Sequence, residues 1–228
     1  MTTNTTEQVA LVTGGSAGLG LALSRALAEQ GWRVITDGRS AEKFKEADLP
    51  ARVTAVVGDL TDAEHRARLH AEVASYGRLD LLVHNASTLG PLPMRQLAEV
   101  DIADLQHVWR TNIGGPLVLT SMLLPWLQAA EGVLLSVSSD AAVNHYETWG
   151  LYGASKAALD HVTLTYAAET GLTGYAVDPG DMRTAMHQDA FPGEDISDRP
   201  LPETVVPRLQ ALLDAHPDSG RYRAEDFG

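Results

Sequence analysis

The stretch "VALVTGGSAGLGLALSRALAEQG", residues 9–31, decides the fold that this sequence predicts. Its first five residues are a continuous apolar run, typical of a buried strand, and glycines follow at once. From Leu19 to Leu27, apolar residues recur every three or four positions, which predicts a helix with one buried face ending near Gly31. A buried strand, a glycine-rich turn and an amphipathic helix in this order are typical of the first unit of a parallel α/β sheet.

The same alternation continues along the chain. Further strands are expected at 33–37, 53–59, 79–86, 132–139 and 174–180, with helices at 61–76, 101–128 and 153–169. The sequence "TDAE" at 61–64 matches a capping box and predicts the start of the first of these helices. Strands that alternate with helices predict a single α/β domain, a doubly wound, Rossmann-type parallel sheet with helices on both faces.

The domain is expected to cover residues 9–228, after a short disordered lead at residues 1–8. Residues 181–203 carry three prolines and six acids and break the rhythm of strands and helices. This segment is expected to be one long loop, either a substrate lid or a surface excursion.

Composition excludes several classes of function. A net charge of −13, with 17 Lys and Arg residues, argues against a nucleic-acid partner and favours a solvated acidic surface. The chain has no cysteine, so it has no disulfide, no thiolate nucleophile and no cysteine-ligated metal. The eight histidines show no metal-binding spacing, so no metal is expected, and His65 and His70 are predicted to lie on a solvent-facing helix side.

The sequence also predicts a cytoplasmic protein without a membrane partner. Its first residues lack the basic start and apolar stretch of a signal peptide. The apolar residues 113–130 include Pro116, Pro125 and several polar side chains, which favours a buried helix over a membrane span.

The glycine loop "TGGSAGLG", residues 13–20, lies between the first strand and the first helix. Glycines there allow a tight turn and let backbone N–H groups approach a pyrophosphate at the positive end of the helix. The general dinucleotide pattern is GxGxxG, but Gly14, Gly18 and Gly20 are spaced TGxxxGxG. A merely tight connection, without a ligand, remains the alternative for this loop considered alone.

The TGxxxGxG spacing resembles that of the short-chain dehydrogenases/reductases, and further motifs follow in the order of that family. These are "GDL" (58–60), "HNAS" (84–87), Asn112, Ser139, "YGASK" (152–156) and "DPGDMRT" (178–184). The resemblance runs from about Val9 to Thr184, most of the chain. It implies a Rossmann-type oxidoreductase that transfers hydride between a nicotinamide cofactor and a carbonyl or secondary alcohol group.

Tyr152 and Lys156 stand four residues apart at the start of a predicted helix, so their side chains share one face. A neighbouring ammonium lowers the pKa of a phenol and suits it to proton transfer near neutral pH. The resemblance assigns Tyr152 as general acid/base, Ser139 as hydrogen-bond donor to the substrate oxygen, and Asn112 as holder of an irregular helix and a proton relay. Ser138 is the rival of Ser139, but the thirteen-residue interval to Tyr152 favours Ser139.

The segment "ITDGRS", residues 35–40, is expected to select the cofactor. The position that is acidic in NAD-dependent members falls on Gly38, and Arg39 falls where NADP-dependent members carry a base. Asp37 lies one place earlier and is expected to cap or face away. NADP is therefore predicted, with NAD as the alternative, although the other common base position, in the glycine loop, is Ala17. The residues that the resemblance implies for cofactor binding are Gly14, Ser16, Gly18, Leu19, Gly20, Arg39, Asp59, Leu60, Asn85, Ala86, Tyr152, Lys156, Pro179, Gly180 and Thr184.

A small or mid-sized carbonyl compound or alcohol is the predicted substrate. Its site is expected beside Leu89 and the 181–203 segment, and the expected substrate-binding residues are Ser139, His145, Tyr146, Trp149 and Tyr152. The resemblance also implies a homodimer or homotetramer. An NADP-binding sensor or scaffold without turnover is the alternative function, whereas an extended epimerase is disfavoured by the glycine spacing.

Three departures from the family limit what is carried over. Only 27 residues separate Tyr152 from Pro179, about one helical turn fewer than expected, and this affects a helix that helps to build subunit interfaces. The family's final strand is expected to be abbreviated or missing, because the sequence ends at Gly228. Ser87 also replaces a glycine beside the cofactor.

Overall fold

The computed structural model describes residues 7–228 and contains one parallel sheet. Within this range seven strands pair in the order β3-β2-β1-β4-β5-β6-β7, and every neighbouring pair is parallel. The strands are β1 (Val9–Val12), β2 (Arg33–Gly38), β3 (Val53–Val57), β4 (Leu81–His84), β5 (Val133–Val137), β6 (Thr173–Asp178) and β7 (Gly220–Arg223). The α/β class and the doubly wound parallel sheet are thus confirmed.

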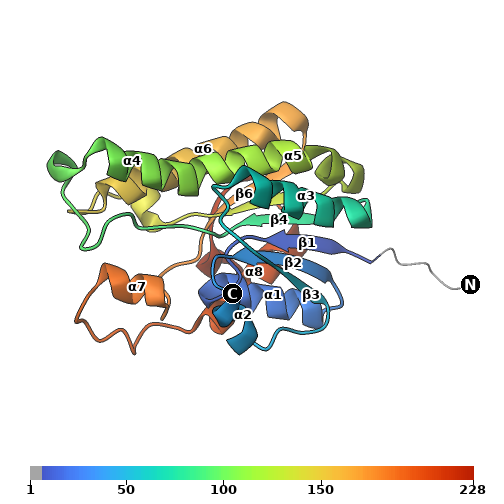
Figure 1. The fold of residues 1–228 in the computed structure, drawn as a ribbon, viewed down its shortest axis with the longest axis horizontal. Helices are drawn as coiled ribbons and strands as arrows, with labels where there is room; N and C mark the ends of the chain where they lie inside the picture. The colour runs from blue at the N-terminus through green and yellow to red at the C-terminus, as the bar shows by residue number, and fades with distance from the viewer. Residues whose placement is uncertain (1–6) are drawn as a thin grey trace, which may run out of the picture.

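Helices cover both faces of the sheet (Figure 1). One face carries α1 (Gly18–Glu29), α2 (Ala41–Glu46) and α8 (Pro202–Ala215). The other carries α3 (Ala63–Tyr76), α4 (Ile102–Trp109), α5 (Gly115–Ala130) and α6 (Gly150–Thr170). Each face has its own core cluster, in which Leu23 of α1 packs with Leu209 of α8 on one side and Leu69 of α3 packs with Leu123 of α5 on the other.

The structure corrects several local expectations. The cap of α3 is Asp62, whose side chain accepts from the N–H of Glu64 at 3.0 Å, so the capping box that begins at Thr61 is wrong. The 181–203 segment is not one loop, because Thr184 caps a short helix, α7 (Ala185–Ala190). The final strand is present as the four-residue β7, and α2 and α8 are not among the helices expected above. Residues 1–6 of the expected lead lie outside the described residues, and Gln8 is already tied to β2 by the N–H of Arg33.

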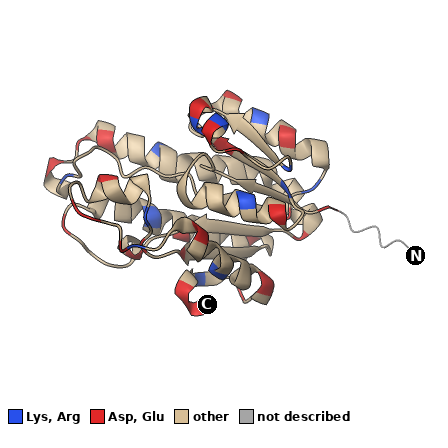
Figure 2. Ribbon diagram, turned by 90° about the horizontal axis from the view of Figure 1, so that it is seen from below, with Lys and Arg blue, Asp and Glu red and all other residues tan. Residues whose placement is uncertain are grey.

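One helical run in the described chain, Ile102–Ala130, is long and apolar enough to cross a membrane by length and composition, and 39% of its most apolar window is buried. Its second part, α5, lies along the sheet over β4 and beside α3, as Figure 1 shows. Acidic side chains are spread over many helices and loops rather than gathered on one element (Figure 2).

Candidate functional site

The candidate site residues gather at the carboxyl ends of the strands, on one edge of the sheet. The glycine loop follows β1, Arg39 follows β2, Asp59 follows β3, Asn85 follows β4, Ser139 follows β5 and Pro179 follows β6. The chain order reverses between β1 and β4, and open α/β sheets bind ligands at such a switch point.

The glycine loop forms a close-packed cradle. Gly14 and Gly18 have φ values of +72° and +55°, in the left-handed region that favours glycine. A Cβ atom on Gly14 would lie 2.8 Å from the Cα of Ala86, and the Asn85 amide donates to the carbonyl of Thr13 at 2.9 Å. The loop is therefore held against the end of β4.

The start of α1 fits a pyrophosphate. This helix has no side-chain cap and no acidic residue in its first turn, so its free N–H groups and positive dipole end suit an anion. Ser16 lies beside Gly38, where an added Cβ would be 2.9 Å from the serine Oγ, and a Cβ on Gly20 would meet the carbonyl of Gly14 at 2.5 Å. Leu19 is buried in the core, which leaves only its backbone for a cofactor.

Asp37 is held inside the protein, where its carboxylate has two partners. It accepts from the N–H of Gly14 at 2.8 Å and pairs with Nε2 of His65 at 2.9 Å. The expectation that His65 lies on a solvent-facing helix side is wrong, because its ring is fully buried in this pair. Asp37 therefore fixes the glycine loop and is not free to bind a ribose hydroxyl.

Arg39, in contrast, is exposed and makes no hydrogen bond with the rest of the described chain. Its charge acts on the neighbouring Asp59. Burial alone would raise the pKa of Asp59, but the N–H of Thr61, at 2.8 Å, and the charge of Arg39 outweigh burial and lower it. Leu60, next in the chain, is buried. Arg39 is thus available for a phosphate at the edge where the adenosine is expected.

Tyr152 and Lys156 lie together at the start of α6. The Lys156 Nζ is 5.6 Å from the centre of the Tyr152 ring and donates to the carbonyl of Val137 at 2.8 Å. Burial lowers the pKa of Lys156 to about 8. Burial also raises the pKa of Tyr152 above its ordinary value, while the hydroxyls of Ser87 and Ser139 act in the opposite direction as hydrogen-bond partners. The phenol is therefore kept protonated, ready to act as an acid, and the lower pKa expected from the neighbouring ammonium is not found, because burial outweighs it.

The structure distinguishes the two neighbouring serines. The Ser138 hydroxyl is buried and donates to Asp160 Oδ2 at 2.7 Å. Ser139 Oγ lies beside the Tyr152 phenol and accepts from the N–H of Ala141 at 3.2 Å. Ser139 is thus the serine that shares a site with Tyr152.

Asn112 lies in a π-helical turn, Arg110–Gly114, between α4 and α5. Its side-chain amide donates to the carbonyl of Thr88 and to Ser155 Oγ, each at 2.9 Å, and its oxygen accepts from the N–H of Thr88 at 2.9 Å. Asn112 therefore joins the segment after β4 to the residue that precedes Lys156, which is a positioning arrangement.

The segment after β6 closes over the glycine loop. Gly180, which follows Pro179, has a φ of +75° and donates from its N–H to Asp178 at 3.0 Å. A Cβ atom on Gly18 would lie 3.4 Å from the Thr184 methyl group, so Thr184 faces the helix end that fits a pyrophosphate.

Two of the three expected aromatic residues lie close to the catalytic candidates. Trp149 meets the Tyr152 ring edge-on with 5.7 Å between ring centres, and it contacts Phe191 at the same distance. Tyr146 donates to Asp140 Oδ2 at 2.7 Å, beside Ser139. His145 is exposed, and within residues 7–228 no hydrogen bond or ring contact joins it to the others.

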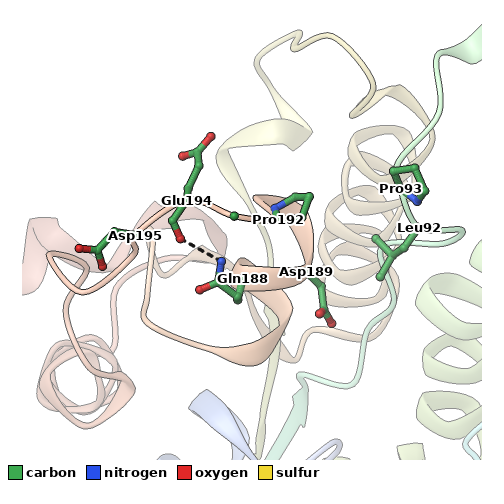
Figure 3. A pocket seen from close by; sticks show the side chains of 8 residues that line it. Leu92, Pro93, Gln188, Asp189, Pro192, Glu194 and Asp195 are labelled. Carbon is green, nitrogen blue, oxygen red and sulfur yellow. Dashed lines mark hydrogen bonds between the residues drawn. The ribbon is translucent and has the colours of Figure 1, made fainter.

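A cavity of about 810 Å³ opens next to this cluster (Figure 3). It lies between the Leu92–Pro93 turn and the 188–195 segment, where Gln188 donates to the carbonyl of Glu194 at 3.1 Å. None of its eight lining residues is a catalytic candidate. However, Met186 and Ala190 of α7 pack against the cluster of Leu89 and Tyr152. The same helix therefore borders both the cavity and the surroundings of the catalytic candidates.

Several residues that the structure brings to the site are not among those predicted from the sequence. Asp160 could have been found, because it lies four residues after Lys156 and shares its helix face. Phe191 and Arg221 reach the site only through the tertiary fold. In the described chain, no group of three His, Cys, Asp or Glu side chains is placed to hold a metal ion.

Comparison with known proteins gives a family match and many relatives. A short chain dehydrogenase family model matches residues 8–195. The chain is 32% identical to the uncharacterized oxidoreductase YciK of Escherichia coli K12, over 91% of this chain and 86% of that protein. It is 33% identical to serine 3-dehydrogenase of Agrobacterium fabrum, over 76% of this chain and 72% of that protein.

Solved structures give the same result at the level of the fold. A short chain dehydrogenase of Shigella flexneri, in complex with NADP, has a TM-score of 0.87 and 29% identity, covering 96% of this chain and 97% of that one. A short chain dehydrogenase of Escherichia coli CFT073, in complex with NADPH, has a TM-score of 0.87 and 30% identity, with 96% of each chain covered.

Proposed function

This chain belongs to the short-chain dehydrogenase/reductase family, and from that premise we propose that it is an NADP(H)-dependent oxidoreductase of a small or mid-sized carbonyl compound or secondary alcohol. The observation that carries the proposal is the buried Tyr152 phenol, which has the Ser139 hydroxyl on one side and the Lys156 ammonium close to its ring.

In the direction of reduction, Tyr152 gives its proton to the substrate oxygen, and Ser139 donates a hydrogen bond to the same atom. The ammonium of Lys156 stabilises the phenolate that remains. The bound nicotinamide would supply the hydride, and it would take the hydride back in alcohol oxidation. Asn112 holds Lys156 and the segment after β4 in fixed positions relative to each other, through its hydrogen bonds to Ser155 and Thr88.

The preference for NADP(H) rests on the contrast between Arg39 and Asp37. Arg39 is exposed without a hydrogen-bond partner in the described chain, whereas the carboxylate of Asp37 is already used by Gly14 and His65. The similarity to two structures that hold NADP and NADPH supports the same choice. A relative named for serine supports a small or mid-sized polar substrate.

The proposal is tested by following NADPH consumption over a panel of aldehydes and ketones, and NADP reduction over the matching alcohols. Turnover that requires Tyr152 is the expected result. Tight binding of NADPH without turnover on any member of a broad panel would instead favour the sensor or scaffold function.

We also propose that the protein is a homodimer through α4 and α5 rather than a membrane-bound protein. Trp109, Leu117 and Val118 are about 40% exposed on this helical run, an unusual set of large apolar side chains for a solvated surface.

The double variant Leu117→Glu/Val118→Glu should weaken self-association by about tenfold or more, because two charges would be buried at the contact. Light scattering over a dilution series measures this. Leu201→Glu, on the opposite face of the sheet, is the control, and an unchanged mass for the double variant would contradict the proposal.

A further inference from the structure

The C-terminal strand β7 places an arginine against the catalytic segment. The Arg221 guanidinium donates from Nη2 to the carbonyl of Ser139 at 2.8 Å and from Nε to Asp160 Oδ2 at 3.2 Å. The same Nη2 lies 3.7 Å from Asp178 Oδ2, at the end of β6. One side chain thus joins three elements, β5, β6 and α6, at the point where Ser139 leaves the sheet.

Asp160 is the carboxylate that this arginine neutralises. Its residue is 7% exposed, and Oδ2 also accepts from the Ser138 hydroxyl at 2.7 Å, while Oδ1 has no hydrogen-bond partner in the described chain. Burial raises the pKa of Asp160, and Ser138 and Arg221 act against this rise. A buried carboxylate is costly unless it is paired, so Arg221 is what makes a charged Asp160 tolerable at this position.

The pair acts on the catalytic residues in two ways. Arg221 fixes the Ser139 carbonyl and therefore the backbone from which Oγ projects toward Tyr152. Asp160 lies one helical turn after Lys156 on the same face of α6, and its charge raises the Lys156 pKa against the effect of burial. The other charged groups near the pair are Lys156, which acts on Asp160, and Asp178, which lies 3.7 Å from Arg221. Asp140 and Arg223 act on Asp178 in turn.

We propose that Arg221 is a positioning residue of the active site, which orients Ser139 and balances the charge of Asp160 beside Lys156. This inference rests on the proposed oxidoreductase function. It gives the short C-terminal strand a role in the site, in addition to its place at the edge of the sheet.

The test compares Arg221→Met with Arg221→Lys and with Arg221→Met/Asp160→Asn in the full-length protein. Arg221→Met should lower kcat by about tenfold to a hundredfold, because a small misplacement of Ser139 is costly, and leave NADPH affinity unchanged, because the glycine loop is not touched. In the pH–rate profile of this variant, the rise in the rate of alcohol oxidation (the pH limb) should move to higher pH. The reason is that an unbalanced carboxylate raises the pKa values of Lys156 and Tyr152. The double variant should return the limb toward its original position, and Arg221→Lys should hold the limb while losing part of kcat.

A second readout needs no turnover. An unpaired Asp160 has its pKa raised further in the folded state, so the carboxylate destabilises the fold once it is charged. The free energy of unfolding of Arg221→Met, relative to the unmodified protein, should therefore fall as the pH rises from about 4 to about 8, and this fall should be absent in the double variant. Arg223→Met, on the same strand with an exposed side chain, is the control.

The outcomes separate the two levels of inference. An active enzyme in which Arg221→Met lowers kcat without moving the pH limb, and in which the double variant behaves no differently, would overturn the positioning and charge role. Absence of turnover in the unmodified protein would instead overturn the proposed function, and the unfolding data would still show whether Arg221 balances Asp160.

Discussion

Replacing Tyr152 with phenylalanine should lower kcat by about 10²–10⁴-fold, the range expected when a general acid/base is removed. The change removes only the hydroxyl group, because the ring remains and still packs edge-on against Trp149. NADPH affinity should change little, since the glycine loop and Arg39 are untouched. Steady-state kinetics with the best substrate of the panel, together with fluorescence titration of NADPH, separates the two quantities.

The matched control for this variant is Tyr166→Phe, on the same helix. The Tyr166 hydroxyl donates to the carbonyl of Leu117 at 3.0 Å and lies away from Ser139 and Lys156. Its loss should leave kcat unchanged. Near-normal turnover by Tyr152→Phe would show that the proton comes from another group and that the assignment of the catalytic site is wrong.

The same tyrosine sets the pH dependence of the two directions. Burial holds the pKa of Tyr152 above its ordinary value, so the protonated form needed for carbonyl reduction persists through neutral pH and is lost only at high pH. Alcohol oxidation needs the deprotonated form and should rise with pH. A pH–rate profile in both directions checks this, and parallel profiles would speak against Tyr152 as the titrating group.

Replacing Arg39 with alanine should weaken NADPH binding by about tenfold to a hundredfold, because hydrogen bonds to a charged group contribute about 1.5–3 kcal/mol. NADH lacks the 2′-phosphate, so its affinity should stay the same and most of the preference between the two cofactors should disappear. Titration of both reduced cofactors by fluorescence measures the ratio directly.

Arg33→Ala is a suitable control, since Arg33 begins the same strand but lies at the opposite edge of the sheet and pairs with Glu7 at 2.9 Å. It should change neither affinity. If Arg39→Ala binds NADPH as tightly as the unmodified protein, another residue reads the phosphate or the protein does not prefer NADP(H).

Short-range spacing was sufficient to predict the framework. The apolar run of β1, the glycines after it and the helical spacing from Leu19 to Leu27 gave the first unit of the sheet, and the same alternation gave the parallel fold. Tyr152 and Lys156 were predicted to share a helix face, which their spacing alone requires, and the structure places both at the start of α6. The predicted positions of helix caps and ends were less accurate. The choice between neighbouring cap residues, such as Thr61 and Asp62, depends on local hydrogen bonds like the one that Asp62 accepts.

Contacts between distant segments were decided only by the tertiary structure. The sequence by itself determined that residues 35–40 hold an acid and a base near a strand end. Only the packing of α3 against the sheet made Asp37 a buried partner of His65 and left Arg39 exposed. Likewise, the bond from Arg221 to Ser139 joins residues 82 positions apart, and it exists because β7 pairs with β6 in a register that sets Arg221 opposite Ala176. Spacing fixes which residues share a face of one element, whereas burial and partners depend on which other elements come to lie against that face.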